Sequence, residues 1–216
     1  ISSFKSIGGG RTDTGVHALG QVARIECSND LPESVFLKGV NNHLPKDIRI
    51  LSVEKVDKDF HPVFSAKKKE YFYVVSLNGA SSFFHSLVTS ENCDDEKLSL
   101  MEAGLKLFKG KHDFINYRCL GTEVKSTIRE IYDVSLTRET TLAFGDFTLE
   151  GDFVILRVCG EGFLKQMVRL IVGTLFALGD GKVTLGDIEK SFDYPLENKL
   201  GKVAPPNGLY LDSISY

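Results

Sequence analysis

The chain has 216 residues, of which 42% are hydrophobic and 25% are charged, and its formal net charge is −3. These values describe one or two ordinary globular domains and exclude a disordered or fibrous protein. A membrane-spanning helix is not expected, because no run approaches the about 20 consecutive apolar residues that such a helix needs. The most apolar stretch, residues 163–178, is interrupted by Lys165, Gln166 and Arg169.

The hydrophobic pattern predicts strands and helices in alternation along the chain. In the first third we expect a loop leading into a strand over residues 15–26, a short helix from Pro32 to Asn41, and a strand over residues 48–56. Further strands are predicted over residues 69–77, 127–138, 146–159 and 208–216, with a turn at residues 145–146. Further helices are predicted over residues 94–109, 162–178 and 184–192. The order strand, helix, strands, helix, strand occurs about twice, which suggests an α+β protein of two similar halves with a boundary between Pro62 and Lys69.

The cysteines and the basic residues narrow the kinds of site to expect. Four cysteines are widely separated, with no CxxC pair and no histidine at metal-ligand spacing: Cys27, Cys93, Cys119 and Cys159. This pattern indicates thiols in a reducing compartment and argues against a zinc site. The acidic net charge does not favour nucleic-acid binding, but residues 67–69 and the group Lys106, Lys109 and Lys111 form either a local basic patch or a solvated face.

Residues 8–18, GGGRTDTGVHA, form the densest motif of the chain. Glycines permit positive φ and close backbone approach, so this segment can present Arg11 and Asp13 to a ligand on a tight loop. The plain structural alternative is an Asx turn, in which Asp13 bonds to the following amides. A phosphate loop is excluded, since neither Gly-Lys-Ser/Thr nor a complete GxGxxG is present. The sequence Asp13-Thr14-Gly15 also leaves open an aspartic protease, in which a second copy of the chain supplies the partner carboxylate.

A single arginine stands inside the most apolar predicted helix. Arg169 lies among Met167, Val168, Leu170 and Ile171. Its guanidinium must either reach solvent at the edge of the helix or pair with a carboxylate in the interior. Asp13 is a natural candidate for such a partner, and the pairing would keep the aspartate ionised, as a carboxylate nucleophile must be.

A basic run enters an aromatic strand at residues 67–73, KKKEYFY. On a strand Tyr71 and Tyr73 share one face and Phe72 takes the other. These rings are either ordinary core residues or a surface on which RNA bases stack. In the second case the neighbouring lysines would contact the RNA phosphates.

Together these segments resemble the TruA family of tRNA pseudouridine synthases. Residues 10–18 match the family signature around its catalytic aspartate, and five further segments follow in the family's order. These are FSA at 64–66 leading to YFY at 71–73, HDF at 112–114, TIREI at 127–131, GFLKQMVRLIVGT at 162–174 and APPNGLYL at 204–211. One difference is Gln166, where the family often has histidine; glutamine keeps a hydrogen-bonding side chain but carries no charge.

The resemblance implies a role for four residues. Asp13 would be the nucleophile that, without a cofactor or metal, helps to break the N-glycosidic bond of a uridine so that uracil can rotate and rejoin the ribose through carbon. Tyr71 would stack on the target uracil and assist proton removal, Arg169 would pair with Asp13, and Arg11 would hold the target nucleotide out of the helical stack. His17, Lys165 and Arg129 are weaker candidates for RNA or loop support.

The resemblance also implies an architecture and a partner. We expect residues 1–66 to form an N-terminal half that lacks the family's first strand and helix, and residues 67–216 to form the C-terminal half. Mainly antiparallel sheets of the two halves would join into one extended sheet, with helices on one face and the active cleft between the halves. The expected protein is a cytoplasmic homodimer that modifies the anticodon stem-loop of tRNA. A catalytically inactive RNA-binding relative is the main alternative.

Overall fold

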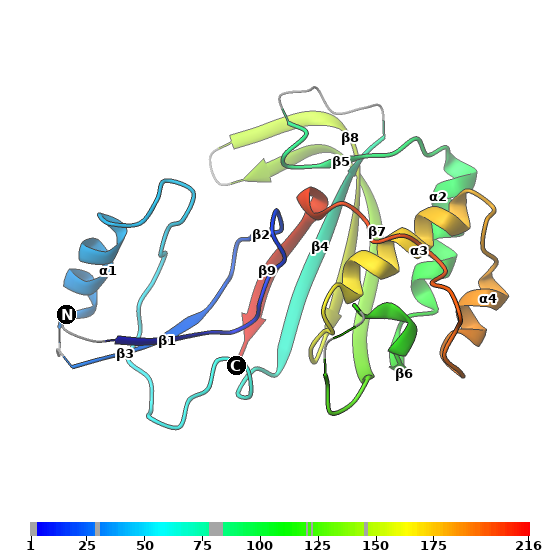
Figure 1. Ribbon diagram of the computed structural model, residues 1–216. Helices are drawn as coiled ribbons and strands as arrows, with labels where there is room; N and C mark the ends of the chain where they lie inside the picture. The colour runs from blue at the N-terminus through cyan, green and yellow to red at the C-terminus, as the bar shows by residue number, and fades with distance from the viewer. Residues whose placement is uncertain (1–3, 29–30, 78–83, 120, 122, 145–146) are drawn as a thin grey trace. The chain divides into compact units, whose positions relative to one another are not determined.

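The computed structural model describes residues 4–28, 31–77, 84–119, 121, 123–144 and 147–216 (Figure 1). The chain divides into two compact units. The first comprises Ile1–Gly10 and Val22–Ser65, and the second comprises Arg11–Gln21 and Ala66–Tyr216. The loop that carries Asp13 therefore belongs to the same unit as Tyr71 and Arg169.

The first unit contains a two-stranded sheet and one helix. Strands β1 (Phe4–Gly8) and β3 (Ala23–Cys27) pair antiparallel, with Phe4 opposite Cys27 and Gly8 opposite Ala23. Helix α1 (Glu33–Asn41) follows Pro32, whose fixed φ suits the start of a helix. The strand predicted within residues 15–26 and the helix predicted from Pro32 to Asn41 are both confirmed.

The strand predicted over residues 48–56 is wrong. No strand forms in this segment, and its apolar side chains Ile48 and Leu51 are 52% and 76% exposed. The reason lies in Asn41, whose side-chain amide donates to the Ile50 carbonyl at 2.9 Å and accepts from the Ile50 amide at 2.8 Å. Asn41 thus satisfies both backbone groups of Ile50, which a neighbouring strand would otherwise pair.

A seven-stranded sheet forms the centre of the second unit, in the order β2-β9-β4-β8-β7-β6, with β5 beside β4. The strands are β2 (His17–Ala18), β4 (Lys68–Ser76), β5 (Thr89–Ser90), β6 (Gly110–Asp113), β7 (Ile128–Phe144), β8 (Phe147–Gly160) and β9 (Leu209–Ser215). Most neighbours are antiparallel, whereas the short pairs β2 with β9 and β4 with β5 are parallel. All four strands predicted after residue 66 are confirmed, and the turn predicted at residues 145–146 lies outside the described residues. The likeness of two halves stays a prediction.

The helices of the second unit pack on one face of this sheet (Figure 1). They are α2 (Asp95–Lys106), α3 (Met167–Gly179) and α4 (Leu185–Lys190), with short 3₁₀ turns η1 (Ile115–Tyr117) and η2 (Pro206–Gly208). The Asp94 side chain accepts the Lys97 amide and caps α2, and Thr184 forms a capping box with Asp187 at α4. These local signals explain why the helices predicted over 94–109 and 184–192 are confirmed. Among the described residues, no helix is long and apolar enough to cross a membrane.

Two apolar clusters lie on opposite faces of the sheet. The cluster on the helical face contains Tyr73 of β4 together with Met101 of α2 and Ile171 of α3, all fully buried. The cluster on the other face contains Phe72 of β4 and Tyr210 of β9, whose rings stack with their centroids 4.7 Å apart. The alternation predicted for β4 is therefore confirmed, because neighbouring residues of this strand enter different clusters.

Helix α3 begins at Met167 rather than at residue 162 as predicted. Gln166 precedes it in the left-handed conformation, with φ 63°, and is the one non-glycine residue with positive φ in the described part of the chain. Its carbonyl accepts the Leu170 amide at 2.9 Å, which is the first bond of the helix. Such a conformation costs free energy for a residue with a side chain, so the surrounding contacts must hold it in place.

We predict that Asn41→Ala loosens the segment around Ile50. The substitution removes both bonds to the Ile50 backbone, so amide exchange at Ile50 should accelerate about tenfold or more. Hydrogen exchange measured by NMR checks this result. Asn42→Ala is the matched control, since Asn42 is exposed and contributes only backbone bonds among the described residues. Equal exchange rates in the two variants would contradict the role given to Asn41.

Candidate functional site

The loop that carries Asp13 is attached to an edge of the large sheet. Strand β2 pairs parallel with β9, His17 opposite Tyr210, and the Leu19 amide donates to the Leu211 carbonyl at 2.8 Å. The loop closes on itself through the Val16 amide, which donates to the Asp13 carbonyl at 3.0 Å. Gly15 has φ +82°, and a Cβ atom there would lie 3.0 Å from Cγ of Pro206. The turn thus requires glycine both for its conformation and for its packing.

Arg169 meets Asp13 in a short ion pair. Its Nη1 donates to Oδ2 of Asp13 at 2.7 Å, and the two side chains are 11% and 23% exposed. The Nε atom donates to the Ala204 carbonyl at 2.7 Å, and the Ala204 amide donates back to the Arg169 carbonyl at 3.1 Å. Of the two alternatives that the sequence left open for Arg169, the structure therefore shows the pair with an interior carboxylate.

The ion pair bears on the aspartic-protease alternative. In such proteases two carboxylates share one proton, so each must face the other. Asp13 instead accepts a charged hydrogen bond from Arg169, so its partner among the described residues is a cation and not a second carboxylate. This contact argues against the aspartic-protease reading of Asp13-Thr14-Gly15.

Tyr71 lies on the helical face of β4 within the electrostatic influence of Asp13. Burial, and then the negative charge of Asp13, raise the pKa of Tyr71 to about 12. Its ring meets Phe163 edge to face, with centroids 5.1 Å apart. The phenol is therefore protonated at neutral pH, and its ring is oriented by an aromatic neighbour.

The other predicted residues differ in how they are held. Arg11 is exposed, and none of the described residues gives its side chain a hydrogen bond or ion pair. His17 stacks on Tyr210 with centroids 4.6 Å apart, and its Nε2 lies 2.9 Å from the Ser86 carbonyl, so it has a structural environment. Arg129 donates to the nearby carbonyls of Ser126 and Ile128. The structure thus gathers Asp13, Tyr71 and Arg169 and does not add His17 or Arg129 to them.

Acidic neighbours neutralise part of the predicted basic patches. Lys106 pairs with Glu102 at 2.7 Å, and Lys109 pairs with Asp133 at 2.8 Å. At the start of β4, Lys68 lies 3.3 Å from Glu70. These lysines therefore present less net positive charge than their sequence spacing suggested.

The sequence pattern did not assign a role to the segment whose Ala204 carbonyl accepts a hydrogen bond from Arg169. The hydroxyl of Tyr73 donates to the Pro205 carbonyl at 2.8 Å and lies 2.7 Å from Oγ1 of Thr89. Two successive prolines are the sequence signal for this arrangement. Because Pro205 and Pro206 have no N–H group, the segment cannot join a regular strand ladder, and its carbonyls must find other donors.

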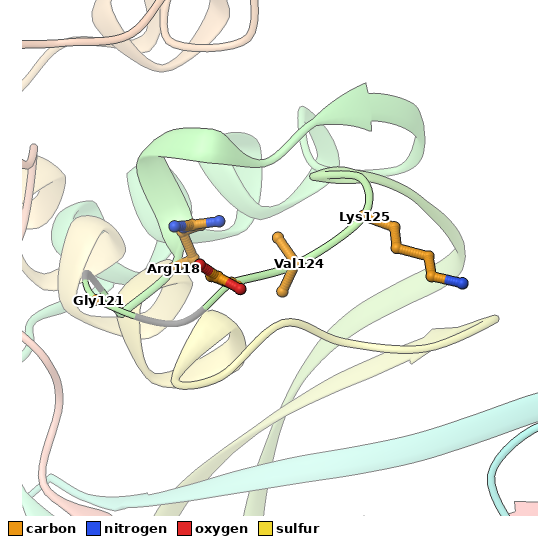
Figure 2. A pocket seen from close by; sticks show the side chains of 5 residues that line it. Arg118, Gly121, Val124 and Lys125 are labelled. Atoms are coloured by element: carbon orange, nitrogen blue, oxygen red, sulfur yellow. The ribbon is translucent and has the colours of Figure 1, made fainter.

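A separate hollow lies in the loop between η1 and β7. It is lined by Arg118, Gly121, Glu123, Val124 and Lys125, and Figure 2 shows the side chains of Arg118, Val124 and Lys125 along the loop. None of the residues at Asp13 belongs to this lining, so the hollow is not the site described above. The histidine, cysteine, aspartate and glutamate side chains of the described residues do not gather into any group that could hold a metal ion. All four cysteines are described, and none forms a disulfide.

Comparison with known proteins points to one family. A protein-family model described as tRNA pseudouridine synthase matches residues 105–216. The chain is 37% identical over 213 residues to the tRNA pseudouridine synthase A of Thermodesulfovibrio yellowstonii, covering 99% of this chain and 84% of that protein. It is 36% identical over 209 residues to the protein of the same name from Ruminiclostridium cellulolyticum, covering 95% and 80%. With the homologue from Acetivibrio thermocellus the identity is 37% over 213 residues, covering 97% and 82%.

We predict that Asp13→Asn lowers the pKa of Tyr71. The substitution removes the negative charge that disfavours the phenolate, so the pKa should fall below about 12. It should stay above the ordinary value of 10.0, because burial is the larger cause of the rise. NMR titration of ¹³C-labelled tyrosine measures the shift. The exposed Asp193→Asn is the matched control and should leave the Tyr71 titration unchanged; the same shift in both variants would exclude the influence of Asp13.

Proposed function

The chain belongs to the tRNA pseudouridine synthase family, and on that premise we propose that it isomerises uridine to pseudouridine in the anticodon stem-loop of tRNA, with Asp13 as the nucleophile. Members of this family are isomerases, and so is this enzyme. The observation that carries the finer proposal is the contact between Asp13 and Arg169, because a partly buried carboxylate on a loop at the sheet edge pairs there with a guanidinium.

The geometry of the pair suits a nucleophile. Among the described residues, Arg169 is the one hydrogen-bond partner of the Asp13 side chain, and it engages Oδ2. The other carboxylate oxygen is then available to a substrate, and the side chain retains 23% of its exposure. In the reaction the carboxylate donates an electron pair to form a transient bond with the substrate, and the bond from ribose C1′ to uracil N1 breaks. After the base has turned, C5 bonds to C1′ and the bond to the aspartate breaks, which regenerates the carboxylate. The proton lost from C5 is matched by the proton gained at N1. Every atom is conserved overall, so the isomerisation consumes no co-substrate.

Tyr71 supports the proposal as a surface for the uracil ring. An aromatic face beside the nucleophile can stack on a base that has been turned out of its helix. The raised pKa of Tyr71, about 12, disfavours a phenolate that waits to accept a proton at neutral pH. Stacking is therefore the better supported of the two roles considered for this residue.

Arg11 completes the proposed site. Its exposed guanidinium is free of described partners, so it can meet a phosphate or hold the displaced nucleotide without first breaking another contact. The presence of Asp13, Tyr71 and Arg169 together favours an active enzyme over an inactive RNA-binding relative. The family resemblance further supports a cytoplasmic homodimer that grips one tRNA, which is part of the same proposal.

We predict that Asp13→Asn abolishes isomerisation while leaving tRNA binding intact. Asparagine still offers Arg169 an acceptor but has no nucleophilic charge, so the rate should fall about a thousandfold or more. Pseudouridine formed in tRNA is quantified after incubation with each variant. Asp193→Asn, an exposed aspartate of the same unit, should keep the wild-type rate. If the Asp13→Asn variant retained its activity, the assignment of Asp13 as the nucleophile would be refuted.

Mapping the modified positions tests the proposed substrate site. Pseudouridine should appear in the anticodon stem-loop, and the affinity for tRNA should decrease as salt is raised, because phosphate contacts release counterions. Modification confined to other parts of tRNA would contradict the anticodon assignment. Salt-sensitive binding with no pseudouridine formed by the wild-type chain would favour the inactive relative instead.

A further inference from the structure

The 204–207 segment accepts hydrogen bonds from two side chains, those of Arg169 and Tyr73. It reads Ala204-Pro205-Pro206-Asn207, and its two prolines cannot donate backbone hydrogen bonds. The carbonyls of Ala204 and Pro205 are neighbours in the chain, and each accepts a side-chain donor. Nε of Arg169 donates to the first at 2.7 Å, and the hydroxyl of Tyr73 donates to the second at 2.8 Å.

Tyr73 is well suited to hold the Pro205 carbonyl in one place. Its side chain is fully buried, and Oγ1 of Thr89 lies 2.7 Å from the phenol oxygen. A hydroxyl has one proton, so while Tyr73 donates to Pro205 its oxygen can accept the proton of Thr89; Oδ1 of Asn207, 3.3 Å from Oγ1 of Thr89, is the other acceptor for that proton. A buried phenol with both a donor and an acceptor partner has little freedom to rotate, and the carbonyl that it binds shares that restraint.

Asn207 anchors the other end of the segment. Its side-chain amide donates one proton to the Val88 carbonyl at 2.7 Å and the other to the His85 carbonyl at 2.5 Å. Both amide protons are therefore used, and both partners lie in the stretch that leads into β5. Thr89, the first residue of β5, is the residue that supports Tyr73. Residues 85–89 thus hold Asn207 directly, and they reach Pro205 through Thr89 and Tyr73.

The same segment contacts the Asp13 loop and approaches α3. Pro206 packs against Gly15, where a Cβ atom would lie 3.0 Å from Cγ of the proline. On the other side, a Cβ atom at Gly173 of α3 would overlap the carbonyl oxygen of Lys202. The segment therefore touches the loop that presents Asp13 and continues from a stretch pressed against the helix that presents Arg169.

We propose that Tyr73, supported by Thr89, is a positioning residue for the isomerisation: it holds the 204–207 segment so that the Ala204 carbonyl orients the Arg169 guanidinium toward Asp13. This inference rests on the proposed function of Asp13. Tyr73 does not contact Asp13 and acts through Pro205, Ala204 and Arg169. A small displacement of Arg169 would misplace the nucleophile, and misplacement by about 1 Å can cost about a hundredfold in rate.

The first test compares two buried tyrosines in the full chain. Tyr73→Phe removes the hydroxyl that holds Pro205, and we expect kcat to fall about 10- to 100-fold with KM for tRNA changed less than about twofold. Tyr117→Phe is the matched control, because Tyr117 is 1% exposed and its hydroxyl lies 2.7 Å from Oγ of Ser191. It should lose stability to a similar extent, measured by thermal unfolding, and keep the wild-type kcat.

A second pair of variants keeps the inference testable if Tyr73→Phe does not fold. Thr89→Val removes the hydroxyl that lies within hydrogen-bond distance of both Tyr73 and Oδ1 of Asn207, whereas Thr89→Ser retains it. We expect kcat to fall in the valine variant and to be restored in the serine variant. In an Arg169→Lys background, which changes the group that Ala204 orients, Tyr73→Phe should cost less in kcat than it does in the wild type, because effects transmitted through one residue are not additive.

These outcomes separate the inference from the proposed function. If Asp13→Asn is inactive but Tyr73→Phe has the same kcat as Tyr117→Phe, then Tyr73 is only structural and the inference is overturned while the nucleophile stands. Full additivity of Tyr73→Phe with Arg169→Lys would also overturn it. If Asp13→Asn keeps its activity, the proposed function itself fails.

Discussion

The charge of Arg169 inside an apolar helix is the constraint on which the site depends. A guanidinium that is 11% exposed has lost most of its hydration, so protein atoms must supply an opposite charge and hydrogen bonds. Asp13 provides the charge, and the Ala204 carbonyl provides a second acceptor. The Asp13 loop and helix α3, whose paired residues are 156 positions apart in the chain, are thereby brought together, and the aspartate side chain stays 23% exposed.

Strand β9 and the residues before it connect this charge to the sheet. The strand lies between β2, which carries the Asp13 loop, and β4, which carries Tyr71 and Tyr73. The 204–207 segment precedes β9, and Pro205 and Pro206 have no backbone N–H with which to pair in a strand ladder. The carbonyls of Ala204 and Pro205 accept instead from side chains of α3 and β4. The sheet edge, the helix and the loop are consequently held relative to one another by backbone carbonyls as well as by packing.

The two polar side chains beside the proposed substrate have different surroundings. Asp13 contacts the guanidinium of Arg169. Tyr71 is buried and lies near the negative charge of Asp13, so its pKa rises to about 12 and it stays neutral. One residue can therefore supply an electron pair while the other supplies an uncharged aromatic face. A tyrosine is already neutral at pH 7, and burial together with the charge of Asp13 raises the pKa of Tyr71 further from that pH.

Local patterns in the sequence determined most elements and the identity of the candidate residues. Capping side chains marked α2 and α4, alternation marked β4, and the Asp13 motif and the lone Arg169 were both evident along the chain. The prediction of a strand over residues 48–56 was wrong, since the Asn41 side chain bonds the Ile50 backbone in place of a partner strand. The predicted start of α3 was also wrong, because Gln166 has a left-handed conformation. Only the tertiary structure decided that Arg169 meets Asp13 instead of solvent and that Tyr73 holds Pro205. Such contacts join residues 156 and 132 positions apart, and no periodicity or local propensity encodes which distant carbonyl or carboxylate will satisfy a buried donor.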